Sequence, residues 1–203
     1  MSRLAPPSAL GEPAWEMATR FPNQGNWSEE EYLHVFANRG VELVDGRIEV
    51  LPAPTEEHQD ILVFLFQALS KFVNERRLGK VQLAGLRVRV KEGKFREPDV
   101  VFMLTEHAGR REKKYWRGAD LAMEIVSEDD PDRDLKTKRD EYADAGIAEY
   151  WIVDPRTKTI AVLTLPEGED VYAESGVYEE GSVAESALLE GFRVDVTAAF
   201  TVD

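Results

Sequence analysis

Two carboxylates stand in apolar stretches of the chain, where an unpaired charge is unfavourable. Asp99 follows Pro98 within one such stretch, and Glu124 lies between Met123 and Ile125 in another. A buried carboxylate is costly unless a cation or a metal ion compensates it. If the two stretches form neighbouring strands, the carboxylates repel each other, and a divalent cation removes that repulsion. Because both ligands are hard oxygens, the expected cofactor is Mg²⁺ (or Mn²⁺), held by one or two carboxylates and waters.

The helix expected over residues 131–145 adds a cation to this pair. Asp134, Lys138 and Tyr142 follow one another at intervals of four residues, so they share one helix face. If this face covers the end of the Glu124 strand, Lys138 lies beside the carboxylates. Such an ammonium can hold a phosphate oxygen, orient a water molecule or stabilise charge that develops during attack. The metal would polarise a phosphodiester and generate hydroxide.

Each of these residues also has an ordinary explanation. Asp99 could belong to a turn or a bulge, and Glu124 could pair with an arginine. Asp134 and Lys138 could form a helical ion pair worth only about 0.3–0.5 kcal/mol when exposed. The combination of two strand carboxylates with a lysine on the next helix nevertheless favours a metal site.

Local patterns predict a mixed sheet with helices packed on it. Ser28 and Glu31 form a capping box that predicts a short helix, and Asp45-Gly46 predicts a hairpin. Apolar residues at helical spacing predict a long helix over 56–78 that ends at Gly79. Strands are expected over residues 81–90, 95–104, 119–127, 149–155 and 159–165. The helix between the third and fourth of these is long enough to join parallel neighbours.

Composition narrows the class of protein. The 203 residues suit one domain over 27–203, preceded by a Pro-, Ala- and Gly-rich tail or arm over 1–26. The chain has no cysteine, which excludes disulfides, zinc-thiolate sites and cysteine nucleophiles. No apolar run approaches the roughly 18 residues that span a membrane, and the N-terminus lacks a signal-peptide core. We therefore expect a soluble, cytoplasmic protein with no membrane association.

The net charge of -14 argues against general attraction to nucleic acid. Basic residues are nevertheless concentrated between Lys71 and Arg96, and again over 109–118. They could form a basic face, or they could be the solvent-facing residues of alternating strands.

Three stretches of the chain together resemble the Uma family of restriction endonucleases, within the PD-(D/E)XK nuclease superfamily. They cover residues 41–61, 96–103 and 119–155, and the resemblance extends over about 28–200. It implies an α/β (α+β) fold, with a restriction-endonuclease-like core and a mixed central β-sheet flanked by helices.

The resemblance also implies a catalytic set. Asp99 matches the aspartate of the "PD" half-motif and Glu124 matches the (D/E) position, so both would bind the metal. The lysine expected two residues later falls on Val126. Lys138 matches the position that the family uses on the following helix, and Lys136 is a nearby alternative.

Further residues would support this set. Glu42, which could be a third acidic ligand, and His58, which opens the long helix, match recurring positions and would complete the cleft. Asp134 and Tyr142 would assist from the helix face. The family usually has Ser-Pro-Ser-Thr after the Glu124 strand, whereas residues 127–131 read Ser-Glu-Asp-Asp-Pro. The added negative charge would strengthen metal binding or repel a DNA backbone.

The leading hypothesis is a Mg²⁺-dependent endonuclease that hydrolyses DNA phosphodiester bonds, with DNA as its partner. One alternative is a catalytically inactive nuclease fold that serves as an interaction or oligomerisation module, which the acidity favours. Another is a metal-dependent phosphodiesterase that acts on RNA or nucleotides. A homodimer or higher homo-oligomer is expected, because a nuclease that cuts both strands often pairs and the arm could clasp a neighbour.

Overall fold

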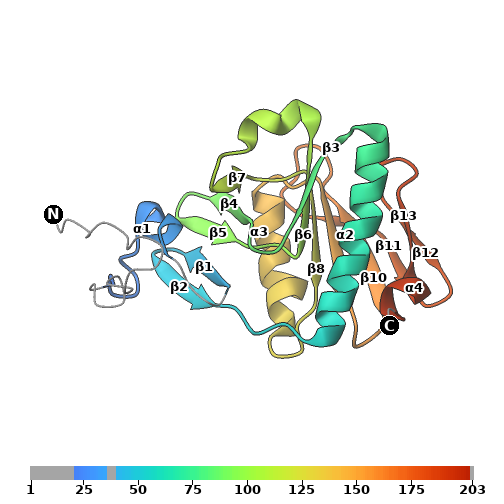
Figure 1. Ribbon diagram of the computed structural model, residues 1–203, viewed down its shortest axis with the longest axis horizontal. Coiled ribbons are helices and arrows are strands. Elements are labelled where there is room, and N and C mark those ends of the chain that lie inside the picture. Colours follow the sequence, from blue (N-terminus) through green and yellow to red (C-terminus); the bar gives the residue numbers. More distant parts are fainter. Residues whose placement is uncertain (1–20, 36–39, 202–203) are drawn as a thin grey trace, which may run out of the picture.

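A six-stranded sheet lies at the centre of the protein, whose computed structural model describes residues 21–35 and 40–201 (Figure 1). The strands lie in the order β11-β10-β9-β8-β6-β3. Their bounds are β3 (Gly79–Leu83), β6 (Val100–Leu104), β8 (Leu121–Ile125), β9 (Glu149–Asp154), β10 (Thr159–Thr164) and β11 (Ala173–Glu179). Strands β8 and β9 run parallel, whereas the other neighbours run antiparallel. The mixed central sheet with flanking helices confirms the predicted fold class.

Helices cover both faces of this sheet. One face packs against α2 (Glu56–Arg76) and the C-terminal elements, whereas the other packs against α3 (Lys138–Asp144) and a second sheet (Figure 1). The C-terminal elements are β12 (Val183–Glu185), β13 (Arg193–Asp195) and α4 (Val196–Phe200). Side chains alternate along β8: Met123 contributes to the α2 side of the core and Ala122 to the α3 side. By the same alternation Glu124 points towards α3.

The second sheet has five strands in the order β2-β1-β5-β4-β7. Their bounds are β1 (Val41–Val44), β2 (Arg47–Val50), β4 (Arg87–Lys91), β5 (Lys94–Arg96) and β7 (Tyr115–Arg117). The capping box and the hairpin are confirmed: α1 (Glu29–Leu33) follows Ser28, and β1 pairs with β2 around Asp45-Gly46. The short helix η2 (Thr105–Arg110) connects β6 to β7. Neither η2 nor β7 was predicted from the sequence.

Two expected strands prove to be pairs of strands that belong to different sheets. Residues 81–90 divide between β3 and β4, and residues 95–104 divide between β5 and β6. Gly85 adopts φ +95° at the first break, and Pro98, which has no N–H, lies at the second. Apolar residues continue on both sides of each break, and their pattern does not show which sheet a strand joins.

The predicted end of the long helix is wrong. Helix α2 ends at Arg76, and Arg77 adopts the left-handed conformation at φ 56° that closes it. Gly79 is instead the first residue of β3, where a Cβ atom would lie 2.0 Å from the carbonyl oxygen of Met103. Gly79 is therefore required by close contact between β3 and β6. Gly146, by contrast, does follow α3 with φ 70°, as predicted.

Ion pairs engage several of the basic residues between Lys71 and Arg96, for which the sequence left open either a basic face or the solvent-facing side of strands. Arg89 Nε lies 3.0 Å from Glu29 Oε1, and Arg87 Nε lies 3.5 Å from Glu97 Oε1. Arg96 is buried, with its guanidinium on Glu42 and Glu141. These residues of β4 and β5 therefore stabilise the second sheet instead of forming a free cationic surface.

The predicted tail over 1–26 lies mostly outside the described residues. Its last part contacts the hairpin: the Ile48 N–H donates to Gln24 Oε1 at 2.9 Å, and Phe21 stacks on Trp27. The division into a tail and one domain stays a prediction. Among the helices in the described ranges, none is long and apolar enough to cross a membrane.

Candidate active site

The two strand carboxylates come together at the junction of β6 and β8. Val100 pairs with Met123, so Asp99, one residue earlier, stands opposite Glu124 across the strands. The backbone N–H of Ile125 donates to Asp99 Oδ2 at 2.8 Å and holds that carboxylate against β8. The Glu124 side chain is 2% exposed and that of Asp99 is 13% exposed. Both side chains line one pocket.

Lys138 extends from the next helix into this pair. Its Nζ lies 2.8 Å from Glu124 Oε2 and 2.9 Å from Asp134 Oδ1. The Tyr142 hydroxyl donates to the other oxygen of Glu124 at 2.5 Å. The helix face that the spacing predicted therefore faces Glu124. Its three polar members are buried, so the pair of Asp134 and Lys138 is not an exposed surface bridge.

A π-helical turn starts this helix. In η3 (Arg133–Thr137) the backbone N–H of Lys138 donates to the carbonyl of Arg133, five residues earlier. Such turns are rare in proteins overall, but many of those that occur lie at functional sites. Arg133 and Asp134 of this turn, and Lys138 directly after it, all line the pocket. The helical pattern of the sequence showed no sign of this widening.

His58 approaches the site from the first turn of α2. Its Nε2 lies 3.2 Å from Asp99 Oδ2, and its buried Nδ1 has no partner among the described residues. Burial alone would lower the pKa of His58, but the hydrogen bond to Asp99 and the charges of Asp99 and Asp134 outweigh it and raise the pKa. The imidazole therefore orients Asp99 and adds positive charge as pH falls.

Negative charge is in excess at Glu124. Burial raises the pKa of Glu124 to about 8 against the attraction of Lys138, and the carboxylates of Asp99 and Asp134 raise it further. Burial would lower the pKa of Lys138, but the charges of Glu124 and Asp134 raise it overall. These two pKa shifts oppose each other, because a protonated and therefore neutral Glu124 attracts the Lys138 ammonium less strongly. We take Lys138 as the persistent charge because carboxylate oxygens lie within 3 Å of it on two sides.

This donor set fits a divalent cation. The adjacent carboxylates of Asp99 and Glu124 are hard ligands in a region that already attracts one cation, the Lys138 ammonium. Within residues 21–35 and 40–201, no three acidic or histidine side chains converge into a complete ligand set. Magnesium typically keeps several waters and uses one or two carboxylates, so Asp99 and Glu124 would be sufficient protein ligands for it.

Glu42 is brought near the site but is committed to other partners. It is fully buried, accepts from Arg96 Nη1 at 2.6 Å and from the Glu97 N–H at 2.9 Å, and pairs with Arg133. Burial would raise the pKa of Glu42, but Lys138, Arg96 and Arg133 lower it. Glu42 therefore serves as a charged support behind the site, and a role as third metal ligand has no support in this geometry.

Lys136 is not brought into the site. Its side chain is 71% exposed and pairs with Asp132, one helical turn earlier. Lys138 is the lysine that faces the carboxylates.

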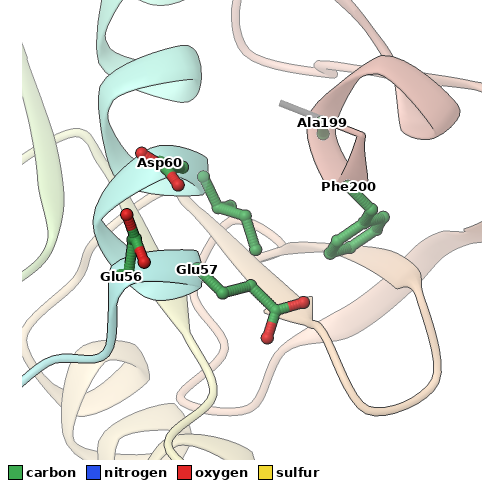
Figure 2. Close-up of a pocket in the computed structure, with 6 residues that line it drawn as sticks. Glu56, Glu57, Asp60, Ala199 and Phe200 are labelled. Carbon is green, nitrogen blue, oxygen red and sulfur yellow. The ribbon is translucent and has the colours of Figure 1, made fainter. Parts of the chain in front are cut away.

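The site lies in a pocket of about 690 Å³. Its lining includes Arg133, which was not predicted from the sequence. The Arg133 guanidinium pairs with Glu42 and Glu49, and Arg133 begins the π-helical turn. A second hollow of about 290 Å³ lies between the start of α2 and α4, lined by acidic side chains and Phe200 (Figure 2). None of the described residues that line it carries a cationic side chain.

The sheet topology and the buried charged site are those of a nuclease-like α+β protein. A family model described as "Uma2: Putative restriction endonuclease" matches residues 29–197, and the chain belongs to this family. A crystal structure of a protein described as "a putative nuclease" from Anabaena variabilis superposes with a TM-score of 0.69. At 18% identity, over 84% of this chain and 96% of that one, this likeness shows a shared fold. No curated protein matches the chain.

Proposed function

We propose that the protein is a Mg²⁺- or Mn²⁺-dependent endonuclease that hydrolyses DNA phosphodiester bonds. The observation that carries the proposal is the opposition of Asp99 and Glu124 across β6 and β8, with Lys138 Nζ 2.8 Å from Glu124. Membership in a family of restriction-endonuclease-like proteins, which generally use divalent metals, supports the class of reaction.

Each side chain has a role that follows from its contacts. Asp99 and Glu124 would hold the metal, which supplies polarisation of the phosphodiester and a water of lowered pKa. Lys138 has three N–H groups, and two are directed at Glu124 and Asp134. The third can donate to a phosphate oxygen and stabilise the charge that grows there. Tyr142 and His58 orient the two carboxylates.

The test combines cleavage with metal binding. The purified protein is expected to cut plasmid DNA and oligonucleotides with Mg²⁺ or Mn²⁺, and Asp99→Ala is expected to lower the rate by at least about a hundredfold. Calorimetric titration with Mn²⁺ should show a site in the wild type that Asp99→Ala loses. Lys136→Ala is the matched control for Lys138→Met and should cut normally, since Lys136 faces solvent. Equal cutting by wild type and Asp99→Ala contradicts the proposed site.

A second candidate is a non-catalytic interaction module. It is favoured by the exposed acidic residues Glu128, Asp129 and Asp130, which follow β8 beside the site and oppose a polyanionic substrate. The two candidates differ in the Mn²⁺ titration. Absence of any binding that depends on Asp99 would support the module.

A further inference from the structure

Acidic side chains surround the mouth of the active-site pocket. Glu128 and Asp129 lie on the loop after β8, and Glu56 and Glu57 lie on the first turn of α2; all four are exposed and line the pocket. Figure 2 shows the same start of α2 from the second hollow, where the Glu57 side chain extends towards Phe200. A polyanion that approaches the site therefore meets negative charge from two separate elements.

Within residues 21–35 and 40–201, few cations lie near this mouth; Arg156 is close enough to interact with Glu128, but its guanidinium is paired with Asp154. Arg133, Lys138 and His58 are the basic residues among the described residues that line the pocket, and all three already contact carboxylates. Arg76 and Arg77 close the far end of the 21-residue α2, about 30 Å from its start. Because exposed charges are screened beyond about 8–10 Å, these arginines cannot offset the acidic mouth.

This charge distribution opposes a continuous duplex. Duplex DNA carries one negative charge per about 1.7 Å of its axis, and duplex-binding proteins neutralise several phosphates with Lys and Arg. A duplex laid across this mouth would set many phosphates against Glu56, Glu57, Glu128 and Asp129. A single strand can bend away on either side and deliver one phosphate at a time.

The pocket walls fit the remainder of a nucleotide. Leu51, Pro52, Pro54, Leu62 and Leu83 line the same cavity as the charged residues. An unpaired base and its sugar can pack against this apolar surface, whereas bases inside a duplex cannot reach it. The volume of about 690 Å³ lies within the range of small-ligand sites.

We propose that the pocket takes a single-stranded DNA segment, such as a strand end or an unpaired flap, and rejects continuous duplex. This inference rests on the proposed nuclease function and defines its class of substrate. The phosphate enters towards Lys138, the base packs on the apolar wall, and the acidic mouth excludes the second strand.

The first experiment compares one labelled DNA sequence in three forms, with Mg²⁺: single strand, blunt duplex, and duplex with an unpaired flap. The single strand and the flap are expected to be cut at least about tenfold faster than the blunt duplex, with scission in the unpaired segment. Duplex cleavage at an equal or higher rate overturns the inference and leaves the nuclease function standing. Cleavage of an RNA strand but not of its DNA equivalent overturns it too.

Binding of the same labelled DNAs, followed by fluorescence anisotropy with Ca²⁺ in place of Mg²⁺, separates the two proposals. Tighter binding of the single strand supports the inference, and equal or weaker binding overturns it. If no form is cut and none is bound, both the inference and the proposed function are contradicted.

Charge variants test the cause of the discrimination. The double variant Glu128→Gln and Asp129→Asn should raise the ratio of duplex to single-strand cleavage by about threefold or more at low salt. High salt should reduce this change, because the repulsion is screened. The control replaces Glu169 with Gln and Asp170 with Asn, two exposed acids that do not line the pocket, and should leave the ratio unchanged. An unchanged ratio in the first variant overturns the inference.

Discussion

At the scale of single residues, the site is defined by the hydrogen bonds that orient the Glu124 carboxylate. The carboxylate receives the Tyr142 hydroxyl on one oxygen and the Lys138 ammonium on the other. Partners of this kind orient a ligand and set its charge, and their loss typically costs 10–100-fold in metal affinity or activity. Tyr142 is therefore a positioning residue, because it acts through Glu124 and does not line the pocket.

Tyr142→Phe tests this assignment. The phenylalanine keeps the packed ring against Tyr150 and removes the donor to Glu124. We expect a kcat about tenfold lower with little change in KM, and weaker Mn²⁺ binding in a calorimetric titration. Tyr172→Phe is the matched control, since its hydroxyl donates to the Ile147 carbonyl away from the site. Unchanged kcat and Mn²⁺ affinity in Tyr142→Phe would show that the hydroxyl serves stability alone.

At the scale of elements, buried ionic contacts join the layers that build the site. The Arg96 guanidinium on β5 binds Glu141 on α3 through two hydrogen bonds of 2.7 and 2.9 Å, and Lys94 adds a third contact at 2.9 Å. These bonds attach the second sheet to the helix that carries Lys138. The order of α3 over the carboxylates therefore depends on contacts outside the pocket.

The Glu141 contacts predict an acid-sensitive component of stability. Burial would raise the pKa of Glu141, but the hydrogen bonds and charge of Arg96 and Lys94 lower it overall. A group whose pKa is lower in the folded state stabilises the fold above its unfolded pKa of 4.5, and this stabilisation is lost as pH falls through the folded value. Glu141→Gln should have a lower Tm than the wild type at pH 7 and a difference that shrinks as pH falls below about 4.5.

Thermal unfolding at several pH values between 7 and 3.5 measures this difference. Asp144→Asn, at the end of the same helix, is a control in which no such trend is expected, because no ion pair of Asp144 is present in the described structure. A Tm difference that stays constant with pH would assign the effect of Glu141 to shape and not to charge.

Glu149 joins β9 to the loop between β12 and β13. This fully buried carboxylate accepts four hydrogen bonds of 2.7 Å, from Trp151 Nε1, Ser186 Oγ and the N–H groups of Ala187 and Leu188. Glu149→Gln keeps the shape, but the amide must direct two donors at groups that are themselves donors. We expect a loss of about 1–3 kcal/mol in the free energy of unfolding, measured by urea denaturation. A change below about 0.5 kcal/mol would contradict this role.

At the scale of the whole molecule, net charge and site chemistry are consistent with each other. A charge of -14 is unfavourable for a protein that wraps duplex DNA, and Arg87, Arg89 and Arg96 of β4 and β5 are engaged in internal ion pairs. The exposed charged residues that line the pocket are all acidic: Glu56, Glu57, Glu128 and Asp129. This distribution of charge favours two partners: a divalent cation, and a flexible substrate that carries fewer charges per unit length than duplex DNA.

Much of the fold could be predicted because local signals and tertiary structure agree. The Ser28 capping box, the Asp45-Gly46 turn and the apolar run that became β8 each carry one strong local preference. The strand breaks near Gly85 and Pro98 could not be predicted. The pattern of apolar residues indicates which side chains are buried, but it does not indicate which sheet a strand joins. The start of β3 at Gly79 depended on Met103, which is distant in sequence.

By itself the sequence determined which residue types could meet: two carboxylates on apolar strands and a lysine, an aspartate and a tyrosine at helical spacing. Only the tertiary structure decided that β6 and β8 are neighbours, that Glu42 pairs with Arg96 and Arg133, and that Arg133 lines the pocket. The physical reason is that spacing along a chain determines faces of single elements, whereas charge balance and strand pairing depend on contacts between residues far apart in sequence.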